Sequence, residues 1–435
     1  MWRACILSIR SFMPLLVAAQ GVVNGPMPGY VDHFAAHIWL QCHQTCSAHL
    51  EYWPTTRPDS ILKTGEIVSD PEKANAMTFT LDRLEPGMEY TYAVVVDDKP
   101  IDLGTPLKFT TRDLWKYRKD PPDLVVATGS CAYINETAYD RPGTPYGDGY
   151  GIFDAIAASR PDLMIWLGDN MYLREPDWGT WQGYMHRYTH LRSLPELQTL
   201  LHGTQHYAIW DDHDYGPNDA DATWVHAPMA REAFALFWPN PTYGAPGVPG
   251  ITTAFNCSDV DFFLLDDRSF RIPSEMVTMR PTMLGQAQVD WLVQALRYSD
   301  ATWKVVALGS EFLSTAAVFE NYATFADERR ELIERIDKEG IRGVVFITGD
   351  RHFAELSELD LPDGRWILDL TSSPLTSGPY HGNETNDLRV PGTYYDKRNF
   401  ALLKFTGRSG SRRLTFEVHA TNGELIWSRT YDAPH

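Results

Sequence analysis

Four short apolar runs, each followed at once by polar residues of the kinds that bind metals, constrain the fold of this chain most tightly. The runs with their polar tails are DLVVATGSC (123–131), DLMIWLGDNMY (162–172), YAIWDDHDYGPN (207–218) and GVVFITGDRH (343–352). Short continuous apolar runs are typical of strands that are buried on both faces of a sheet. In layered α/β proteins, ligands collect at the carboxyl ends of such strands, where the backbone opens into loops. We therefore expect the four tails to meet in space.

The stretch after Pro122 predicts a layered α/β domain, which we place at residues 120–435. Apolar runs there alternate with helical patterns, which fall at residues 151–159, 231–238, 285–296 and 328–336. Such alternation favours a sheet covered on both faces. Toward the end, strand-like runs follow one another with little helix between them, so we expect mixed sheets, two of them packed between helices.

The segment before this domain has a different pattern of apolar and polar residues. Between residues 33 and 111 the chain shows short alternating runs separated by turn residues, which predict a small antiparallel β-sandwich at residues 24–113. The segment 81–96 resembles the corner of a fibronectin type III module, in which the hydroxyl of Tyr90 would pin a turn. A polar, charged linker at residues 116–122 marks the boundary between the two domains.

The first 20 residues have the features of a signal peptide, with Arg3 and Arg10 ahead of an apolar run and small residues near its end. This predicts a secreted or periplasmic protein. The segment around Arg10 also resembles a twin-arginine export signal, except that Ile9 stands where the first arginine belongs. An apolar N-terminal arm or a misassigned start is the alternative. No later run approaches the roughly 20 apolar residues that span a bilayer.

The net charge of the chain argues against some classes of function, and its cysteines indicate candidate structural and metal-binding residues. A formal net charge of −19 and a pI near 5.1 argue against a protein that clamps nucleic acid or an anionic membrane. A phosphate ester remains a possible substrate if metal ions supply positive charge locally. Cys42 and Cys46 are close enough in sequence to bridge across a tight hairpin, and Cys257 is expected to pack as a small hydrophobe. Cys131 stands out because it ends one of the four runs.

The residue types in the four tails predict a mixed metal centre. Carboxylates that converge repel and desolvate one another, so they need cations to hold them together. The thiol, phenol and imidazole groups of Cys131, Tyr172 and His352 suit a transition metal such as iron. Asn218 and the carboxylates suit a hard divalent ion such as calcium. Asp169 lies three residues before Tyr172, so a tight turn brings both side chains to one metal.

The series GSC, GDNMY, WDDHDYGPND and GDRH, with LDDRSFR and LGQAQVDWL between its members, resembles the PhoD family of alkaline phosphatases. That family lies within the calcineurin-like metallophosphatases and also carries a small β-sandwich ahead of its catalytic domain. The resemblance covers nearly the whole chain after the predicted signal peptide. The GDNMY tyrosine is also similar to the iron-binding tyrosine of purple acid phosphatases.

The resemblance implies roles for individual residues. Asp169 would bridge two metals, Fe3+ would be bound by Cys131, Tyr172 and His352, and Ca2+ by Asn218 and Asp350. Ligands of a second calcium are not assigned, and the candidates for them are Asp211, Asp212 and Asp214. Two departures from the wider superfamily are Cys131, where an aspartate usually begins the pattern, and WDDHD in place of GNH.

We therefore expect hydrolysis of phosphate esters by a hydroxide that the two metals activate. Asp212 or His213 would stabilise the transition state or protonate the leaving oxygen. Arg268 and Arg351 are candidates for contacts with phosphate oxygens, or else for structural ion pairs.

The substrate would be a small phosphate ester, a phosphate-containing polymer or a lipid. Three alternatives stay open: a phosphodiesterase or phospholipase D-like hydrolase on the same centre, a non-catalytic surface binding protein, and a redox iron protein. The sequence does not indicate the oligomeric state.

Overall fold

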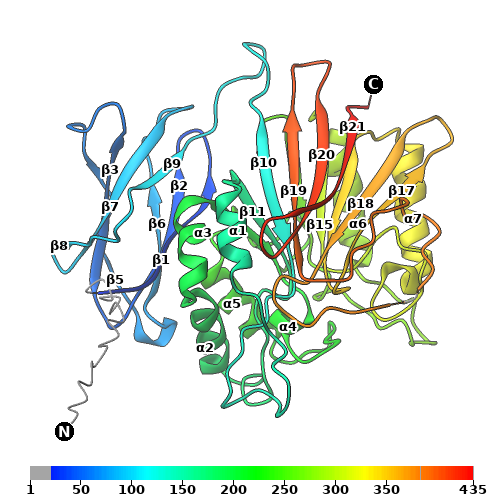
Figure 1. Cartoon of the computed structure of the whole chain (residues 1–435), viewed down its shortest axis with the longest axis horizontal. Coiled ribbons are helices and arrows are strands. Elements are labelled where there is room, and N and C mark those ends of the chain that lie inside the picture. The colour runs from blue at the N-terminus through cyan, green and yellow to red at the C-terminus, as the bar shows by residue number, and fades with distance from the viewer. Residues whose placement is uncertain (1–20, 383, 435) are drawn as a thin grey trace, which may run out of the picture.

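Two large, mixed six-stranded sheets form the centre of the molecule, and two antiparallel sheets, one of three strands and one of six mostly short strands, lie beside them (Figure 1). The computed structural model describes residues 21–382 and 384–434. The predicted signal peptide at residues 1–20 therefore lies outside the described residues.

The two sheets beside the centre come from the N-terminal part of the chain, and all of their strand pairs are antiparallel. The first sheet contains β1 (Val22–Val31), β2 (Ala36–Cys42) and β6 (Ala76–Leu81). The second contains β3 (Ser47–Pro54), β4 (Leu62–Lys63), β5 (Ile67–Val68), β7 (Glu89–Val96), β8 (Lys99–Pro100) and β9 (Leu107–Thr110). Alternate residues of β3 are buried, as expected for a strand with one face on a core. The predicted corner is present, because the Glu85 backbone N–H donates to the Tyr90 hydroxyl at 2.9 Å.

The first large sheet has the strand order β12-β11-β10-β19-β20-β21. Its strands are β10 (Leu124–Gly129), β11 (Leu163–Leu167), β12 (Gln205–Ile209), β19 (Asn399–Thr406), β20 (Arg413–Ala420) and β21 (Leu425–Asp432). β10, β11 and β12 are parallel, whereas β19, β20 and β21 add antiparallel pairs. The three parallel strands therefore end at the same edge.

The second large sheet has the order β13-β14-β15-β16-β18-β17. Its strands are β13 (Thr253–Cys257), β14 (Val260–Leu264), β15 (Trp303–Leu308), β16 (Val344–Thr348), β17 (Ala354–Asp360) and β18 (Trp366–Ser372). β14, β15, β16 and β18 run parallel, and the outer strands β13 and β17 are antiparallel. Both large sheets are thus mixed, as the sequence predicted.

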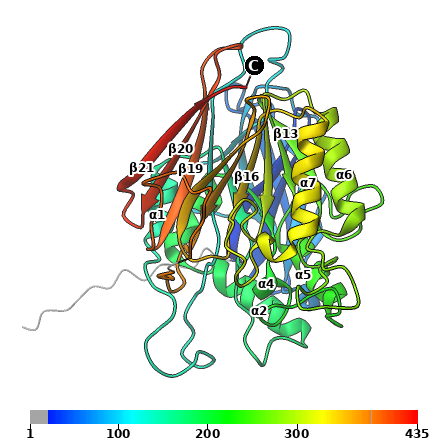
Figure 2. The same cartoon turned by 90° about the vertical axis from the view of Figure 1, so that its right-hand side faces the viewer.

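Helices cover the large sheets on their outer sides (Figures 1 and 2). The longer ones are α1 (Ile152–Ala158), α2 (Trp181–Arg192), α3 (Gln198–Gly203), α5 (Ala227–Phe237), α6 (Gly285–Tyr298) and α7 (Ala326–Lys338). Short helical turns complete the set: η1 (Pro71–Lys73), η2 (Pro195–Leu197), α4 (Asp212–Tyr215) and η3 (Tyr322–Phe325). α6 and α7 pack on the second sheet through their apolar faces. A core of side chains from both sheets fills the space between them, so the predicted layered α/β fold is confirmed.

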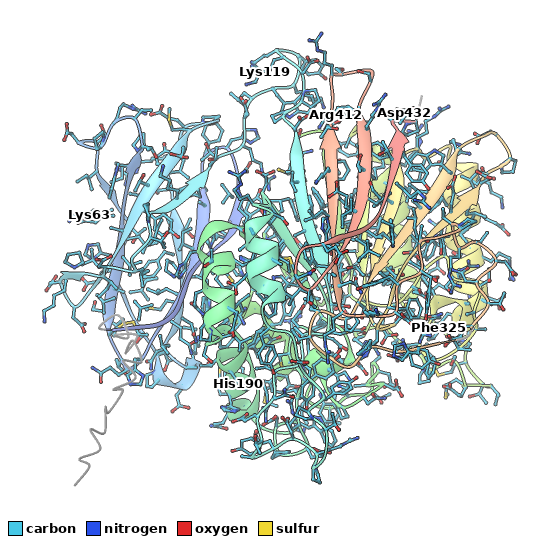
Figure 3. The ribbon with its side chains drawn as sticks, viewed as in Figure 1. Lys63, Lys119, His190, Phe325, Arg412 and Asp432 are labelled. Carbon is cyan, nitrogen blue, oxygen red and sulfur yellow. A yellow bond between two sulfur atoms is a disulfide. The ribbon has the colours of Figure 1, made fainter. Side chains whose placement is uncertain are left out.

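The N-terminal sheets pack directly against the helices of the larger part. The Trp39 indole of β2 donates to the Leu236 carbonyl of α5 at 2.9 Å, and the Gln41 amide donates to the Thr189 hydroxyl of α2 at 2.8 Å. Trp39 belongs to the same buried cluster as the core between the large sheets. In Figure 3, His190 of α2 lies toward the lower end of the view, whereas Lys119 of the connecting loop and Arg412 lie at the upper end.

Cysteine pairing is now defined within the described residues. Cys42 and Cys46 form a disulfide, with their Cα atoms 6.5 Å apart. Cys257 is free and half-buried, and Cys131 is free and buried. Across residues 21–382 and 384–434, the helices are too short or too polar for any of them to cross a bilayer.

Candidate metal centre

The predicted ligands follow the carboxyl ends of strands in both large sheets. Cys131 follows β10, Asp169 follows β11, and Asp350 and His352 follow β16. All four have left-handed backbone conformations, with φ of 61°, 50°, 62° and 58° respectively. Each such conformation costs a non-glycine residue on the order of 1 kcal/mol or more, and strain of this kind gathers at functional sites. The sharp turns bring these side chains together at the carboxyl ends of the strands.

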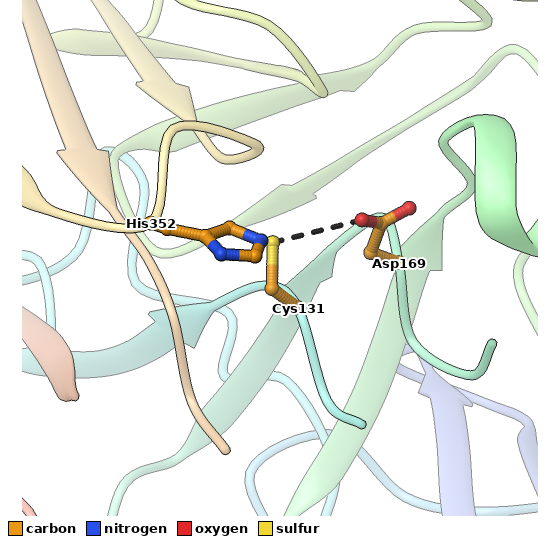
Figure 4. A group of neighbouring side chains, drawn as sticks. All are labelled: Cys131, Asp169 and His352. Carbon is orange, nitrogen blue, oxygen red and sulfur yellow. Dashed lines mark hydrogen bonds between the residues drawn. The ribbon is translucent and has the colours of Figure 1, made fainter. Parts of the chain in front are cut away.

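Cys131, Asp169 and His352 form the centre of the site (Figure 4). Their ligand atoms all lie within 4.8 Å of one another, although the residues are far apart in the chain. The Cys131 thiol donates to Asp169 Oδ2 at 3.7 Å, and the Tyr172 hydroxyl donates to the same oxygen at 2.9 Å. The spacing of Asp169 and Tyr172 therefore places both side chains at one point, as the sequence predicted.

His352 is held in the orientation that a metal ligand needs. Its Nδ1 lies 2.5 Å from the Gly378 carbonyl oxygen, which can only accept, so Nδ1 carries the proton. Nε2 is left as the nitrogen with the lone pair, and the Ser377 hydroxyl lies 3.4 Å from it. Burial lowers the pKa of His352 to about 4, which keeps the imidazole neutral. Tyr146, which no sequence pattern singled out, lies with its hydroxyl 3.3 Å from the same Nδ1.

A second group joins Asp169 to Asp212 and His213, whose ligand atoms also lie within 4.8 Å of one another. The His213 backbone N–H donates to Asp169 Oδ1 at 3.2 Å. The His213 ring packs against the Tyr172 ring, with centroids 4.3 Å apart. Asp212 and His213, the predicted catalytic pair, therefore lie beside the predicted bridging carboxylate.

A third group contains Asp211, Asp212 and Glu320. The sequence did not single out Glu320, because it lies in an irregular loop after β15 without a motif around it. Arg268 is fully buried between these acids: its Nε donates to Asp211 at 2.7 Å and its Nη2 to Glu320 at 2.8 Å. Of the two roles considered for Arg268, these contacts correspond to the structural ion pair.

Asp214, a candidate ligand of a second calcium, fastens the turn. Its carboxylate accepts from the backbone N–H groups of Asn170 at 3.1 Å, Met171 at 3.3 Å and Asp211 at 3.1 Å. The Asp211 contact completes a capping box at the start of α4. Asp214 thereby ties the loop after β11 to the loop after β12, which sets the spacing of the acids around it.

The buried acids fit cations. Burial, together with repulsion from Asp212, Asp214 and Asp350, raises the pKa of Asp169 well above its usual range. Burial likewise raises the pKa of Asp350 to about 6. One oxygen of Asp211, Oδ2, is buried and has no hydrogen-bond partner among the described residues. A buried carboxylate oxygen without a hydrogen-bond partner is costly, and a bound cation removes the cost.

The groups of candidate ligand atoms described above border a cavity of about 600 Å³. Its walls include the predicted ligands Asp169, Asn218, Asp350 and His352, together with Arg351. The Arg351 guanidinium donates to Glu384 at 2.9 Å, and its Nε lies 3.7 Å from a carboxylate oxygen of the buried Glu311. Arg351, unlike Arg268, lines the cavity, and this position makes it the candidate for phosphate binding. The five histidines between the second and third motifs are absent from the described cavity lining: His186, His190, His202, His206 and His226.

Comparisons with known proteins agree with this arrangement. The family model for PhoD-like phosphatases matches residues 126–422. Alkaline phosphatase D of Bacillus subtilis (strain 168) is 23% identical over 413 residues, which are 82% of this chain and 67% of the relative.

Two solved structures share the fold. The structure of PhoD superposes with a TM-score of 0.77 at 18% identity, covering 96% of this chain and 91% of the other. A purple acid phosphatase from yellow lupin (Lupinus luteus) seeds gives 0.66 at 11% identity, covering 93% and 73%. Since the family model spans more than half of the chain, this protein belongs to the PhoD-like phosphatase family of metal-dependent phosphoric ester hydrolases.

Proposed function

We propose that the enzyme hydrolyses phosphate esters, in the manner of an alkaline phosphatase, at a centre of Fe3+ and Ca2+. Cys131, Tyr172 and His352 would hold the iron, Asn218 and Asp350 the calcium, and Asp169 would join the two. The thiol, phenol and imidazole groups suit iron, and the amide and carboxylate oxygens suit calcium. The observation that carries the proposal is the meeting of Cys131, Asp169 and His352 within 4.8 Å.

When bound, such metals lower the pKa of a water and neutralise the charge of the phosphoryl group. The protein contributes orientation and charge. Arg351 lines the same cavity as Asp169 and Asp350. Its guanidinium donates to Glu384 at 2.9 Å, so the planar guanidinium group is oriented before substrate binds. Arg351 then binds phosphoryl oxygens.

His213 protonates the leaving oxygen. Its ring packs on Tyr172, and its backbone N–H is bonded to Asp169, so the imidazole lies next to the site of bond cleavage. Asp212, in the same group of ligand atoms, stabilises the protonated imidazole.

The size of the cavity favours diesters as a second substrate class. About 600 Å³ is far more than one phosphoryl group occupies, and apolar and polar residues both line it. A diester would place its second ester group within this space. The disulfide between Cys42 and Cys46 supports the further proposal that the enzyme acts outside the cytoplasm, where disulfides persist.

The test is a comparison of 4-nitrophenyl phosphate with bis(4-nitrophenyl) phosphate for the wild type and for His213→Ala. We expect hydrolysis of both esters, and a loss of about 100-fold in kcat for His213→Ala. His226→Ala is the control, because His226 lies outside the described cavity lining. Failure of the wild type, loaded with iron and calcium, to hydrolyse either ester would contradict the proposed function.

A further inference from the structure

Two exposed aromatic side chains lie at the mouth of the metal cavity. Phe319 is 63% exposed and Tyr380 is 37% exposed, and their ring centroids lie 5.6 Å apart with the planes at 82°. Both residues line the cavity that contains the predicted metal ligands. They also line an adjoining shallow hollow of about 560 Å³, together with Val318, His381 and Glu384. The two rings thus form a corner between the metal cavity and the outer hollow.

Local contacts fix this corner relative to the centre. The Tyr380 backbone N–H donates to the carbonyl oxygen of His352 at 3.0 Å. Phe319 directly precedes Glu320, whose carboxylate is bonded to the buried Arg268. Each ring is therefore connected through one backbone step or one hydrogen bond to a residue of the metal clusters.

Arg351 links the corner to the phosphate position. Its guanidinium lies 4.7 Å from the centroid of the Phe319 ring and 5.6 Å from that of the Tyr380 ring. These distances are within the range of cation–π attraction. If Arg351 holds a phosphoryl oxygen, the group esterified to that phosphate emerges beside the two rings.

The Phe319 side chain gains little burial from its position within the protein. Its φ of 48° is in the left-handed region, which is unfavourable for a side chain of this size. Its ring is mostly exposed, so burial within the chain does not offset that cost. A ligand with a flat ring could bury the exposed face of Phe319, because stacking on an aromatic face is favourable.

We propose that Phe319 and Tyr380 form a leaving-group subsite, which binds the flat, uncharged ring of an aromatic alcohol or a nucleoside esterified to the phosphate. This proposal rests on the proposed function and names its substrate class. The ring stacks on Phe319 and meets the edge of Tyr380, while Arg351 holds the phosphoryl oxygens. The hollow beside the rings also contains Val318, an apolar side chain that suits an uncharged leaving group.

The test measures inhibition by two phosphonates that differ only in the ring. Benzylphosphonate and ethylphosphonate compete with hydrolysis of glycerol 2-phosphate, which has no ring. We expect Phe319→Ala and Tyr380→Ala each to weaken benzylphosphonate about 10-fold and to leave ethylphosphonate within about 2-fold. Phe319→Tyr should restore tight inhibition, because it returns the flat face. Tyr298→Ala is the matched control, since Tyr298 is 93% exposed on α6, outside both hollows.

The source of the ring is identified by substrate turnover in the same variants. A selective loss of kcat/KM for 4-nitrophenyl phosphate alone would identify aryl esters, and a loss that extends to thymidine 5′-monophosphate would include nucleosides. Equal inhibition constants for the two phosphonates in the wild type, or equal weakening of both in Phe319→Ala, would overturn the subsite. Either result is distinct from a failure of the proposed function, in which the wild type would not hydrolyse glycerol 2-phosphate or any other ester.

Discussion

We expect protonation of His206 to destabilise the folded enzyme in acid, independently of the metal site. The side chain is fully buried in β12, and both ring nitrogens are used: Nδ1 accepts from the Trp166 indole at 3.0 Å, and Nε2 donates to the Leu200 carbonyl at 3.1 Å. These contacts fit only the neutral ring, since a proton on Nδ1 would face the indole N–H. Burial lowers the pKa of His206 from 6.5 to about 3.

The sign of the effect follows from this lowered pKa. Below pH 6.5 the unfolded chain binds a proton at His206 that the folded chain does not bind until about pH 3. The free energy of unfolding therefore falls as the pH drops through this interval, by about 1.4 kcal/mol for each pH unit. At pH 4.5 the loss from this residue is about 3 kcal/mol relative to neutral pH.

The variant His206→Gln tests this linkage, because a glutamine amide accepts from Trp166 and donates to Leu200 without titrating. Thermal unfolding of both proteins is followed by circular dichroism at pH 7.5 and pH 4.5. From pH 7.5 to pH 4.5 the melting temperature of the wild type should fall by roughly 3 °C more than that of the variant, given an unfolding entropy of about 2.1 cal/mol/K per residue. Loss of metal at low pH affects both proteins alike. A difference in melting temperature that is the same at both pH values would refute the reasoning.

Three further outcomes are expected. Removal of metal with a chelator should lower the melting temperature of the enzyme, and returning the metal should restore it. The reason is that a ligand at 100 times its Kd stabilises the folded protein by about 2.7 kcal/mol. An unchanged melting temperature would contradict this expectation. Arg351→Lys should lower kcat/KM about 10-fold or more, since lysine lacks the planar fork, whereas Arg297→Lys on the exposed face of α6 should have no effect. In protein that contains iron, Tyr172→Phe should shift or abolish the visible absorption of an iron–phenolate pair, and an unchanged spectrum would remove Tyr172 from the iron ligands.

The strand ends were predictable from the sequence for a physical reason. A strand buried on both faces must be apolar throughout, so its end is visible where polar residues begin. The four runs accordingly became β10, β11, β12 and β16, and their tails lie together. Nothing in a buried run indicates which sheet it joins, so the sequence did not show that β16 belongs to the second sheet.

The residues that the sequence did not identify lie in irregular loops. Tyr146, Glu320 and Tyr380 reach the site through tertiary packing, and no periodicity or turn pattern marks such positions. Arg268 shows the same limit in another form. Its sequence position next to two aspartates fits either a substrate contact or an ion pair, and only the structure shows that it is completely buried and bonded to Asp211 and Glu320.

The most direct test of the account is the metal content of the purified enzyme with and without Asp169. Elemental analysis should find iron and calcium bound to the wild type, and Asp169→Asn should lose bound metal and hydrolysis of 4-nitrophenyl phosphate together, because its carboxylate lies in two of the ligand groups. Asp154→Asn, an exposed substitution on α1, should retain both. Full metal content and full activity in Asp169→Asn would contradict the central claim that these strand ends hold the catalytic cations.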